Sequence, residues 1–367
     1  MESSNTVRET YRHGQSIWLD HIDRQLIQSG TLEQLIRDQG LTGMTSNPTI
    51  FEKSISGGNL YTQEIKDLIA SGKGNEEIFY CLALEDIEAA ADLFQPVYRQ
   101  AERPGADGFV SLEVSPRLAH DTAGTIQQAN LLWHKAHRNN VMIKIPGTAE
   151  GIPAIRQCIS EGININITLL FGLNRYQQVI DAYLSGLEDR LRKGQPVRDI
   201  ASVASFFLSR IDVLVDPMLE QKGLRDLKGK TAIALAKKAY TIYRKSFTSD
   251  RWMALAQKGA RPQRLLWAST STKDPSFPDT KYVEALIGKD TIDTVPLETL
   301  HSFLDHGKVA DTLESDVPEA DRILESVQKS GIDLEEISQR LETEGIDKFV
   351  KPYDKLMDSI EAYRANQ

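Results

Sequence analysis

The chain has 367 residues and a formal net charge of −9 at pH 7, a balance that argues against a non-specific nucleic-acid binder. Its two cysteines, Cys81 and Cys158, exclude a disulfide framework and a CxxC redox or zinc pair. The N-terminus lacks the apolar core of a secretory signal, and no stretch approaches the roughly 18 apolar residues of a membrane span. We therefore expect a cytoplasmic protein with no membrane or nucleic-acid partner.

Short β-rich or apolar segments recur along the chain, and helical or loop-like stretches separate them. In chain order the predicted strands are 16–20, 41–47, 109–115, 140–146, 164–171, 202–208, 264–270 and 291–295. Apolar residues at helical spacing predict a helix in 84–100, and the stretches 122–137 and 173–191 each follow a predicted strand, while 230–247 can form an extra helix. Eight strands that alternate with helices predict an α/β fold, a TIM (β/α)8 barrel.

Two connections and the tail depart from an even barrel. About 60 residues separate the second predicted strand from the third, and a similar number separates the sixth from the seventh. These gaps have room for additional helices, so one barrel with insertions fits better than two domains. In the charged tail, helical spacing continues from Ile346 to Ile360, and Pro352 predicts a kink or a new helix start. We expect a single domain over 1–367, with a helical C-terminal extension over about 310–367.

The run GININITLLFG at 162–172 has a polar face. Isoleucines alternate there with Asn164, Asn166 and Thr168, a period of two that is typical of a strand. Parallel strands in α/β proteins are usually apolar on both faces because helices cover them. In a small barrel, however, one face looks into the lumen, and the functional sites lie at the C-terminal ends of the strands.

Nearly every predicted strand places a polar side chain near its end. They are Asp20, Thr45, Asn47, Glu113, Lys144, Asn166, Thr168, Ser205 and Ser269. Taken singly, the serines and Asn164 fit ordinary hydrogen-bonding partners, and Asp20 fits a helix cap or turn former. Lys144 is harder to explain, because it stands between Ile143 and Ile145. Either it has a function in a central strand, or it lies in water on an edge strand.

A buried lysine beside carboxylates suits Schiff-base chemistry. Burial favours the neutral amine, which can attack a carbonyl, and the resulting Schiff base is an electron sink for cleaving an adjacent C–C bond. That cleavage needs a base for a substrate hydroxyl, and Asp20 and Glu113 are available. Sugar hydroxyls would be held by Asn47, Asn166, Thr45 and Thr168. The set describes a class I aldolase-type site with no metal or other cofactor.

Six segments carry a resemblance to a known family. They are TSNPTIF (45–51), VSLEVSPRLAHDT (110–122), MIKIPGTAEGIPAI (142–155), EGININITLLFGLNRY (161–176), SFFLSRID (205–212) and WASTSTKDP (267–275). In these segments the chain resembles transaldolase, the Schiff-base transferase of the pentose phosphate pathway. The tail at 348–360 is similar to that family's closing helix, so the resemblance runs from about residue 13 to residue 360.

The resemblance implies a role for each matching residue. Lys144 would form the Schiff base with the C2 carbonyl of a ketose phosphate, sedoheptulose 7-phosphate or fructose 6-phosphate. Asp20 would take the proton from the C4 hydroxyl as the C3–C4 bond breaks. Asn47 and Asn166 would hold the hydroxyls of the remaining dihydroxyacetone unit. An aldose phosphate, glyceraldehyde 3-phosphate or erythrose 4-phosphate, would then accept that unit.

The resemblance also implies a water site and a phosphate site. Glu113 and Thr168 would hold the water used to form and hydrolyse the Schiff base, with Glu113 relaying protons. Arg210 matches the family's phosphate arginine, and a guanidinium suits phosphate geometry. Ser205 and Ser269 match its serine positions.

The sequence departs from the family pattern at one position of the phosphate site. Many members carry a second arginine two residues after the later serine, and this chain has Ser271 there. We expect the nearby Lys273 to supply the charge, and an exposed loop lysine is the alternative. The departure concerns the affinity for phosphate more than the type of reaction.

Two other functions stay open. One is a fructose-6-phosphate aldolase, a branch in which the water-holding carboxylate is typically an amide and a tyrosine stands on the sixth strand. This chain has Glu113 and Phe207 at those places, which favours the transferase. The other is a non-catalytic phosphosugar-binding barrel, against which the intact Lys144 and Asp20 speak. The sequence does not decide whether the protein is a homo-oligomer.

Overall fold

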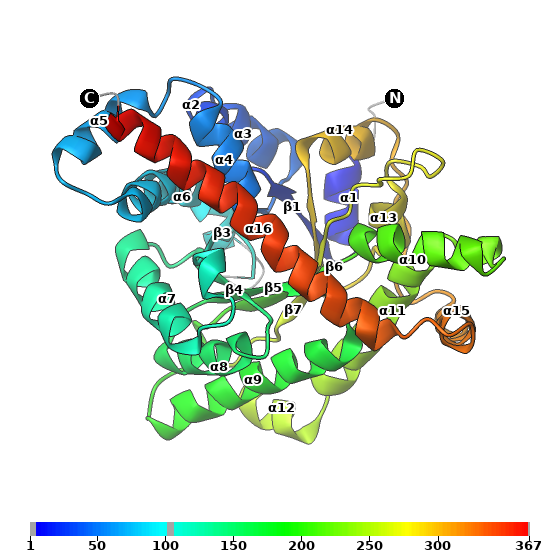
Figure 1. The fold of residues 1–367 in the computed structure, drawn as a ribbon. Helices are drawn as coiled ribbons and strands as arrows, with labels where there is room; N and C mark the ends of the chain where they lie inside the picture. Colours follow the sequence, from blue (N-terminus) through cyan, green and yellow to red (C-terminus); the bar gives the residue numbers. More distant parts are fainter. Residues whose placement is uncertain (1–4, 101–105, 366–367) are drawn as a thin grey trace.

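A closed barrel of eight parallel strands forms the centre of the protein, as the computed structural model of residues 5–100 and 106–365 shows (Figure 1). In order around the ring the strands are β1 (Gln15–Asp20), β2 (Gly43–Thr45), β3 (Val110–Glu113), β4 (Val141–Pro146), β5 (Ile165–Leu170), β6 (Ser202–Phe207), β7 (Arg264–Ala268) and β8 (Thr291–Val295). Pairing of β1 with β8 closes the ring. All eight predicted strands are confirmed, and with them the TIM barrel.

Helices surround the barrel. Those before β7 are α1 (Thr6–Arg12), α2 (Arg24–Gln28), α3 (Thr31–Gln34), α4 (Pro48–Ser56), α5 (Thr62–Ala70), α6 (Asn75–Gln100), α7 (Thr122–Ala136), α8 (Gly151–Glu161), α9 (Leu173–Arg192), α10 (Ser209–Gln221), α11 (Thr231–Ser246) and α12 (Asp250–Ala256). Those after β7 are α13 (Lys281–Ala285), α14 (Leu297–His306), α15 (Val317–Lys329) and α16 (Leu334–Ala365). The two long connections hold the expected extra helices, α4 to α6 and α10 to α12. No helix in the described part of the chain is long and apolar enough to cross a membrane.

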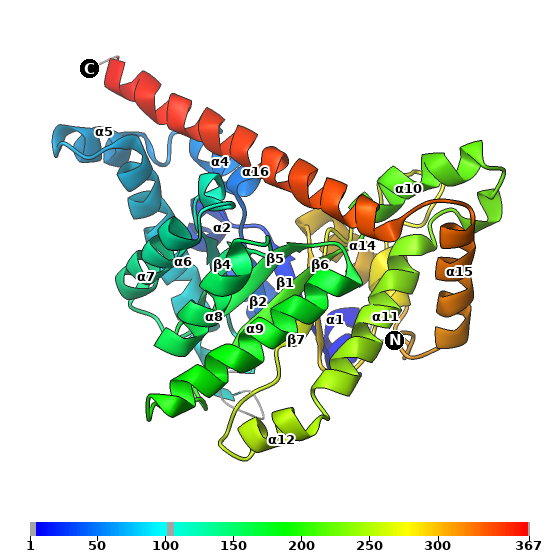
Figure 2. The same ribbon diagram turned by 60° about the horizontal axis from the view of Figure 1, so that its bottom comes forward.

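The tail forms α15 and the long helix α16, which crosses one end of the barrel (Figures 1 and 2). Of the two expectations for Pro352, a new helix start is wrong, because α16 runs through this position. Phe349 and Tyr353 are buried on either side of the proline, and the ring of Tyr353 packs edge-on against Phe79 at 5.7 Å. Packing of this apolar face therefore offsets the backbone hydrogen bond that a proline inside a helix removes.

The strand register brings the polar side chains to one level. Lys144 pairs with Glu113 on one side and with Asn166 on the other. Below that level the lumen is filled by Trp18, whose ring covers Gly43 so closely that a Cβ there would lie 2.5 Å from the ring. Since residues two apart on a strand share a face, a tryptophan two positions before Asp20 closes the barrel beneath the polar layer.

Candidate active site

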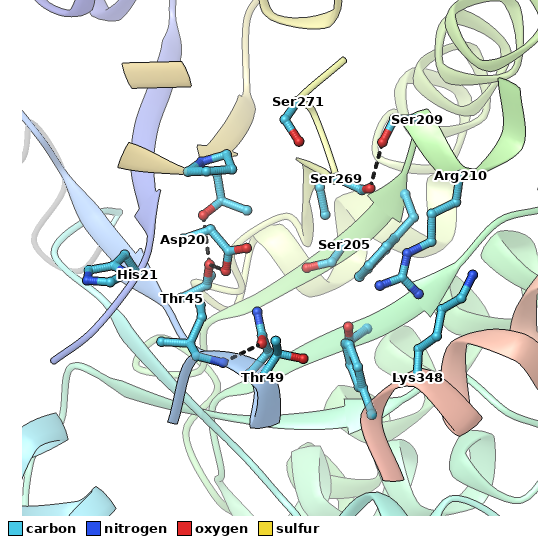
Figure 3. A pocket seen from close by; sticks show the side chains of 18 of the residues that line it. Asp20, His21, Thr45, Thr49, Ser205, Ser209, Arg210, Ser269, Ser271 and Lys348 are labelled. Carbon is cyan, nitrogen blue, oxygen red and sulfur yellow. Dashed lines mark hydrogen bonds between the residues drawn. The ribbon is translucent and has the colours of Figure 1, made fainter. Parts of the chain in front are cut away.

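A cavity of about 880 Å³ opens where the strands end, between the barrel and α16. Its wall includes most of the predicted site residues, as Figure 3 shows for several of them: Asp20, Thr45, Asn47, Lys144, Thr168, Ser205, Arg210, Ser269 and Lys273. Two predicted residues, Glu113 and Asn166, lie behind this wall, in contact with Lys144 and Ser205 respectively. The structure thus gathers the whole predicted set at one end of the barrel.

Lys144 lies at the base of this cavity. Its strand, β4, is bonded on both sides, so the edge-strand alternative is wrong. The side chain is only 6% exposed, and its Nζ donates to the carbonyl oxygen of Ser46 at 2.8 Å. The same Nζ lies 3.3 Å from Oε2 of Glu113, and it lies 5.9 Å from the ring centre of Phe349 on α16. The amine is therefore buried and held in a fixed position.

Asp20 ends β1 and keeps some exposure to the cavity. Its Oδ1 accepts from the hydroxyl of Thr45 at 2.7 Å, and this hydroxyl is also 2.7 Å from that of Thr294. Burial raises the pKa of Asp20, and the positive charge of Lys144 opposes that rise. The helix-cap interpretation of Asp20 is wrong, because Asp23 caps α2 by accepting from the Leu26 amide.

Glu113 is buried behind Lys144. Burial raises the pKa of this carboxyl, the charge of Lys144 opposes the rise, and the charge of Asp20 adds to it. Apart from the ion pair with Lys144, neither carboxylate oxygen has a hydrogen-bond partner among residues 5–100 and 106–365, and the same is true of the buried hydroxyl of Thr168. Buried polar groups of this kind usually bond to protein or to water, so both groups are suited to hold a water molecule.

The two predicted asparagines have different surroundings. Asn47 caps α4, accepting from the Ile50 amide at 3.1 Å, and it borders the cavity. Asn166 donates to Ser111 at 3.1 Å and accepts from the Ser205 hydroxyl at 2.7 Å. It is therefore held among neighbouring strands, with its amide directed by two serine hydroxyls.

Arg210 stands in the first turn of α10, and its guanidinium lies between two aromatic rings. Its Cζ is 5.3 Å from the ring centre of Phe207 and 5.7 Å from that of Phe349. Burial lowers the pKa of Arg210, although a guanidinium stays protonated at any physiological pH. Its Nη1 is buried and has no hydrogen-bond partner within the described part of the chain. An unpartnered cationic donor that faces a cavity is suited to an anion.

The loop after β7 completes this side of the cavity. Ser269 adopts a left-handed backbone conformation, with φ at 56°, and its hydroxyl lies 2.8 Å from that of Ser209. Such a conformation is uncommon for a residue other than glycine and is held only by its surroundings. Lys273 is exposed, and its amine donates to the hydroxyl of Ser271 at 2.7 Å.

The sequence matches the family model described as Transaldolase/Fructose-6-phosphate aldolase over residues 17–360. This chain belongs to that family. It is 47% identical to Transaldolase 2 of Nostoc sp., over 97% of each chain, and 46% identical to the transaldolase of Thermobifida fusca, over 95% of each chain. It is 44% identical to the transaldolase of Trichodesmium erythraeum, over 98% of this chain and 97% of that one.

The transaldolase-family cavity also has wall residues that the sequence interpretation missed. They include His21, Thr49, Lys53, Leu341, Glu344, Lys348 and Phe349, together with other polar and apolar residues. Four of them come from α16. Apolar spacing in the tail predicts a helix, but it does not say against which part of the barrel that helix packs. No pattern in the sequence therefore marks these four residues as part of the site. Helical spacing did identify Phe349 as an apolar contact of the tail.

Proposed function

We propose that this chain is a transaldolase that moves a dihydroxyacetone unit from a ketose phosphate to an aldose phosphate through a Schiff base on Lys144. The observation that carries the proposal is a lysine amine at the base of a deep cavity, 3.3 Å from the Glu113 carboxylate. Near full-length relatives named transaldolase support it. Such an enzyme would work in the non-oxidative pentose phosphate pathway, in the cytoplasm.

The first half of the reaction forms the Schiff base. The Nζ of Lys144 attacks the C2 carbonyl of the ketose phosphate, and the resulting carbinolamine loses one water molecule. Glu113 and Thr168 are proposed to hold that water, and Glu113 to relay the protons, because both have buried polar atoms free for it. Burial raises the pKa of Glu113, which makes its carboxylate a better proton acceptor and suits it to relaying protons.

The second half cleaves and rebuilds a C–C bond. Asp20 accepts the proton of the C4 hydroxyl as the C3–C4 bond breaks, and the bonding electrons pass into the Schiff base to give an enamine. An aldose phosphate leaves, while Asn47 and Asn166 hold the remaining three-carbon unit. The enamine then attacks the carbonyl of a second aldose phosphate, Asp20 returns its proton, and water hydrolyses the new Schiff base to free Lys144.

The phosphate of each substrate is proposed to lie at the Arg210 side of the cavity. Arg210 supplies a fixed guanidinium with a free Nη1, and Ser205 and Ser269 supply hydroxyls nearby. Lys273 borders the same cavity and can approach a bound anion from the loop after β7. This arrangement would direct the sugar carbonyl toward Lys144, deeper in the barrel.

Two residues favour transfer over simple aldol cleavage. Glu113 provides a carboxylate rather than an amide for the catalytic water. Phe207 borders the cavity, packs at 5.3 Å from Phe171 and brings no hydroxyl into the site. A coupled assay separates the two activities: we expect dihydroxyacetone transfer to erythrose 4-phosphate, and little free dihydroxyacetone from fructose 6-phosphate alone.

Reductive trapping tests the Schiff base directly. Incubation with fructose 6-phosphate and borohydride should add a reduced three- or six-carbon fragment at Lys144, located by peptide mass spectrometry. Lys144→Ala should lose the adduct, whereas the control Lys53→Ala, which removes another lysine of the same cavity, should keep it. An adduct that persists in Lys144→Ala, or that maps to another lysine, would show the mechanism to be wrong.

A further inference from the structure

A second cation faces Arg210 from the opposite wall of the cavity. Lys348 lies on α16 and borders the same cavity, and Figure 3 shows its side chain extending toward the guanidinium of Arg210. The close approach of α16 depends on Gly345, where a Cβ would already lie 3.0 Å from Leu169 Cδ2 and 3.5 Å from Arg210 Nη1. The helix therefore brings Lys348 to the barrel rim, one turn after the glycine.

The carboxylates near this pair do not bond Arg210 directly: Asp20, Glu113 and Glu344 influence its pKa, but within the described residues none forms an ion pair with it. Within the described residues the ion-pair partner of Lys348 is Glu344, at 3.7 Å, and Glu344 also accepts a hydrogen bond from Arg340 at 2.8 Å. Arg210 Nη1 has no hydrogen-bond partner. Lys348 thus shares its carboxylate with Arg340, and Arg210 keeps a free donor, so both Lys348 and Arg210 can bond an added anion. A phosphate group has the charge and the several acceptor oxygens to contact both.

The loop after β7 is a weaker source of positive charge for the phosphate than α16. Position 271, two residues after Ser269, is a serine, and Lys273 points its amine at that serine's hydroxyl from an exposed position. Lys348 is exposed as well, but it stands on a helix that the next residue, Phe349, anchors by packing near Arg210. A side chain on a fixed helix loses less conformational freedom on binding than one on an exposed loop.

We propose that Lys348 is a substrate-binding residue that supplies the second positive charge of the phosphate site. The phosphate would be held between the barrel, through Arg210 and Ser269, and α16, through Lys348. The C-terminal helix would thus form one wall of the specificity site. The inference rests on the proposed function and identifies the group that selects phosphorylated sugars.

The test compares phosphorylated and unphosphorylated acceptors. In Lys348→Gln we expect the kcat/KM ratio of glyceraldehyde 3-phosphate over glyceraldehyde to fall by about 10- to 100-fold, the range for losing one bond to a charged group. Activity with glyceraldehyde itself should stay within a factor of two. Binding of inorganic phosphate, measured by calorimetry, should weaken by a similar factor, and Lys348→Arg should restore both.

Two matched variants decide where the charge comes from. Lys351→Gln removes an exposed lysine of the same helix that does not border the cavity, and it should change nothing. Lys273→Gln should weaken phosphate binding by a smaller factor than Lys348→Gln does. The proposal is overturned if Lys273→Gln has the larger effect, or if Lys348→Gln leaves phosphate binding unchanged or weakens both acceptors equally.

The same experiments separate this inference from the proposed function. If the wild-type protein forms no borohydride adduct at Lys144, the transaldolase mechanism fails. Calorimetry with inorganic phosphate needs no turnover, so a loss of binding in Lys348→Gln would still establish the anion site, and unchanged binding would still exclude it.

Discussion

Three ionisable side chains, Asp20, Glu113 and Lys144, influence one another at the base of the cavity. Burial alone would keep both carboxyls protonated at higher pH than usual, and the charge of Lys144 counteracts this. Each carboxyl therefore depends on the lysine for its ionised form, and the lysine depends on the Ser46 carbonyl and on Glu113 for its position. Because the three are coupled, substitutions among them will not have additive effects.

Asp20→Asn tests the proposed base. The amide has nearly the same shape and can still accept from Thr45, but it cannot remove the C4 proton. We expect kcat to fall by about 10²- to 10⁴-fold, the range for loss of a general base. Lys144 should still be trapped by borohydride, because attack on C2 does not need Asp20. The control is Asp358→Asn, an exposed residue outside the cavity. If kcat falls less than tenfold, another group removes the proton.

The pH dependence of kcat/KM should also reflect Asp20. A general base works only when it is ionised, and the pKa of Asp20 is raised above its ordinary 3.8 by burial. Activity should therefore decline on the acid side at a higher pH than that of an unperturbed aspartate. In Asp20→Asn, the kcat/KM profile of the residual activity should show this acid-side decline at a different pH or with a different steepness. A wild-type profile that is flat down to pH 4 would contradict the proposed environment.

At this scale the sequence predicted the residues carried by strands and missed those carried by α16. Period two places Lys144, Glu113 and Asp20 on lumen faces, and a barrel then brings those faces together. Asn164 also fits its sequence interpretation, since its amide bonds to the carbonyls of Asn139 and Val141 rather than bordering the cavity. The roles of these residues stay predictions until the variants above are measured.

At the scale of an element, α16 joins the tail to the chemistry. Its predicted apolar positions are all buried: Ile346, Phe349, Tyr353, Leu356 and Ile360. Ion pairs such as Lys355 with Glu52 and Arg117 with Asp354 lie along its edges. Lys355 is exposed although its partner Glu52 is buried, and the side chains of Arg117 and Asp354 are both exposed, so solvent screens these pairs and the apolar face contributes more to holding the helix in place. The sequence predicted this face, but the surface that receives it is formed by distant segments and could not be predicted from spacing.

Gly345 should control how closely α16 approaches the barrel. In Gly345→Leu the new side chain would meet Leu169 and Arg210, so α16 should move outward and take Lys348 with it. We expect KM for glyceraldehyde 3-phosphate to rise about tenfold or more, as for loss of a charged contact, with a smaller change in kcat.

Gly345→Ala is the graded control for that change. Its Cβ would meet the flexible end of Leu169 at 3.0 Å, and alanine stabilises a helix interior by up to about 1 kcal/mol relative to glycine. Activity should therefore stay close to that of the wild type. Equal KM values for the leucine variant and the wild type would mean that α16 does not set the phosphate site.

For the whole molecule, the sequence predicted the number of strands in the barrel but not the side-chain packing that fills the barrel interior. Eight apolar or alternating segments were enough to count the strands, because each must bury at least one face. The packing of Trp18 over Gly43 depends on a contact between two strands that neither segment specifies alone. That residues 1–367 form a single domain stays a prediction.

The far side of β8 contains a buried acid that the proposed chemistry does not use. Asp293 is fully buried, and because Thr294 borders the cavity, its neighbour Asp293 faces away from the lumen. Neither carboxylate oxygen has a hydrogen-bond partner in residues 5–100 and 106–365. Burial raises the pKa of Asp293 to about 8, although the nearby Thr270 hydroxyl opposes the rise. The folded protein therefore binds a proton here that the unfolded chain releases near its ordinary value of 3.8.

Asp293→Asn should remove a pH-dependent loss of stability. Between pH 4 and pH 8 the folded state holds the proton and the unfolded state does not, so the stability from this group is full below about pH 4 and lost by about pH 8. The amide cannot ionise. Between pH 4 and pH 8 the free energy of unfolding of the variant should therefore rise relative to that of the wild type, by several kcal/mol in total. Urea unfolding at pH 5 and pH 8.5 measures the difference, with Asp358→Asn as the exposed control. A gap between variant and wild type that is the same at both pH values would show that Asp293 is ionised in the folded protein, and a new partner for its charge would then have to lie against β8.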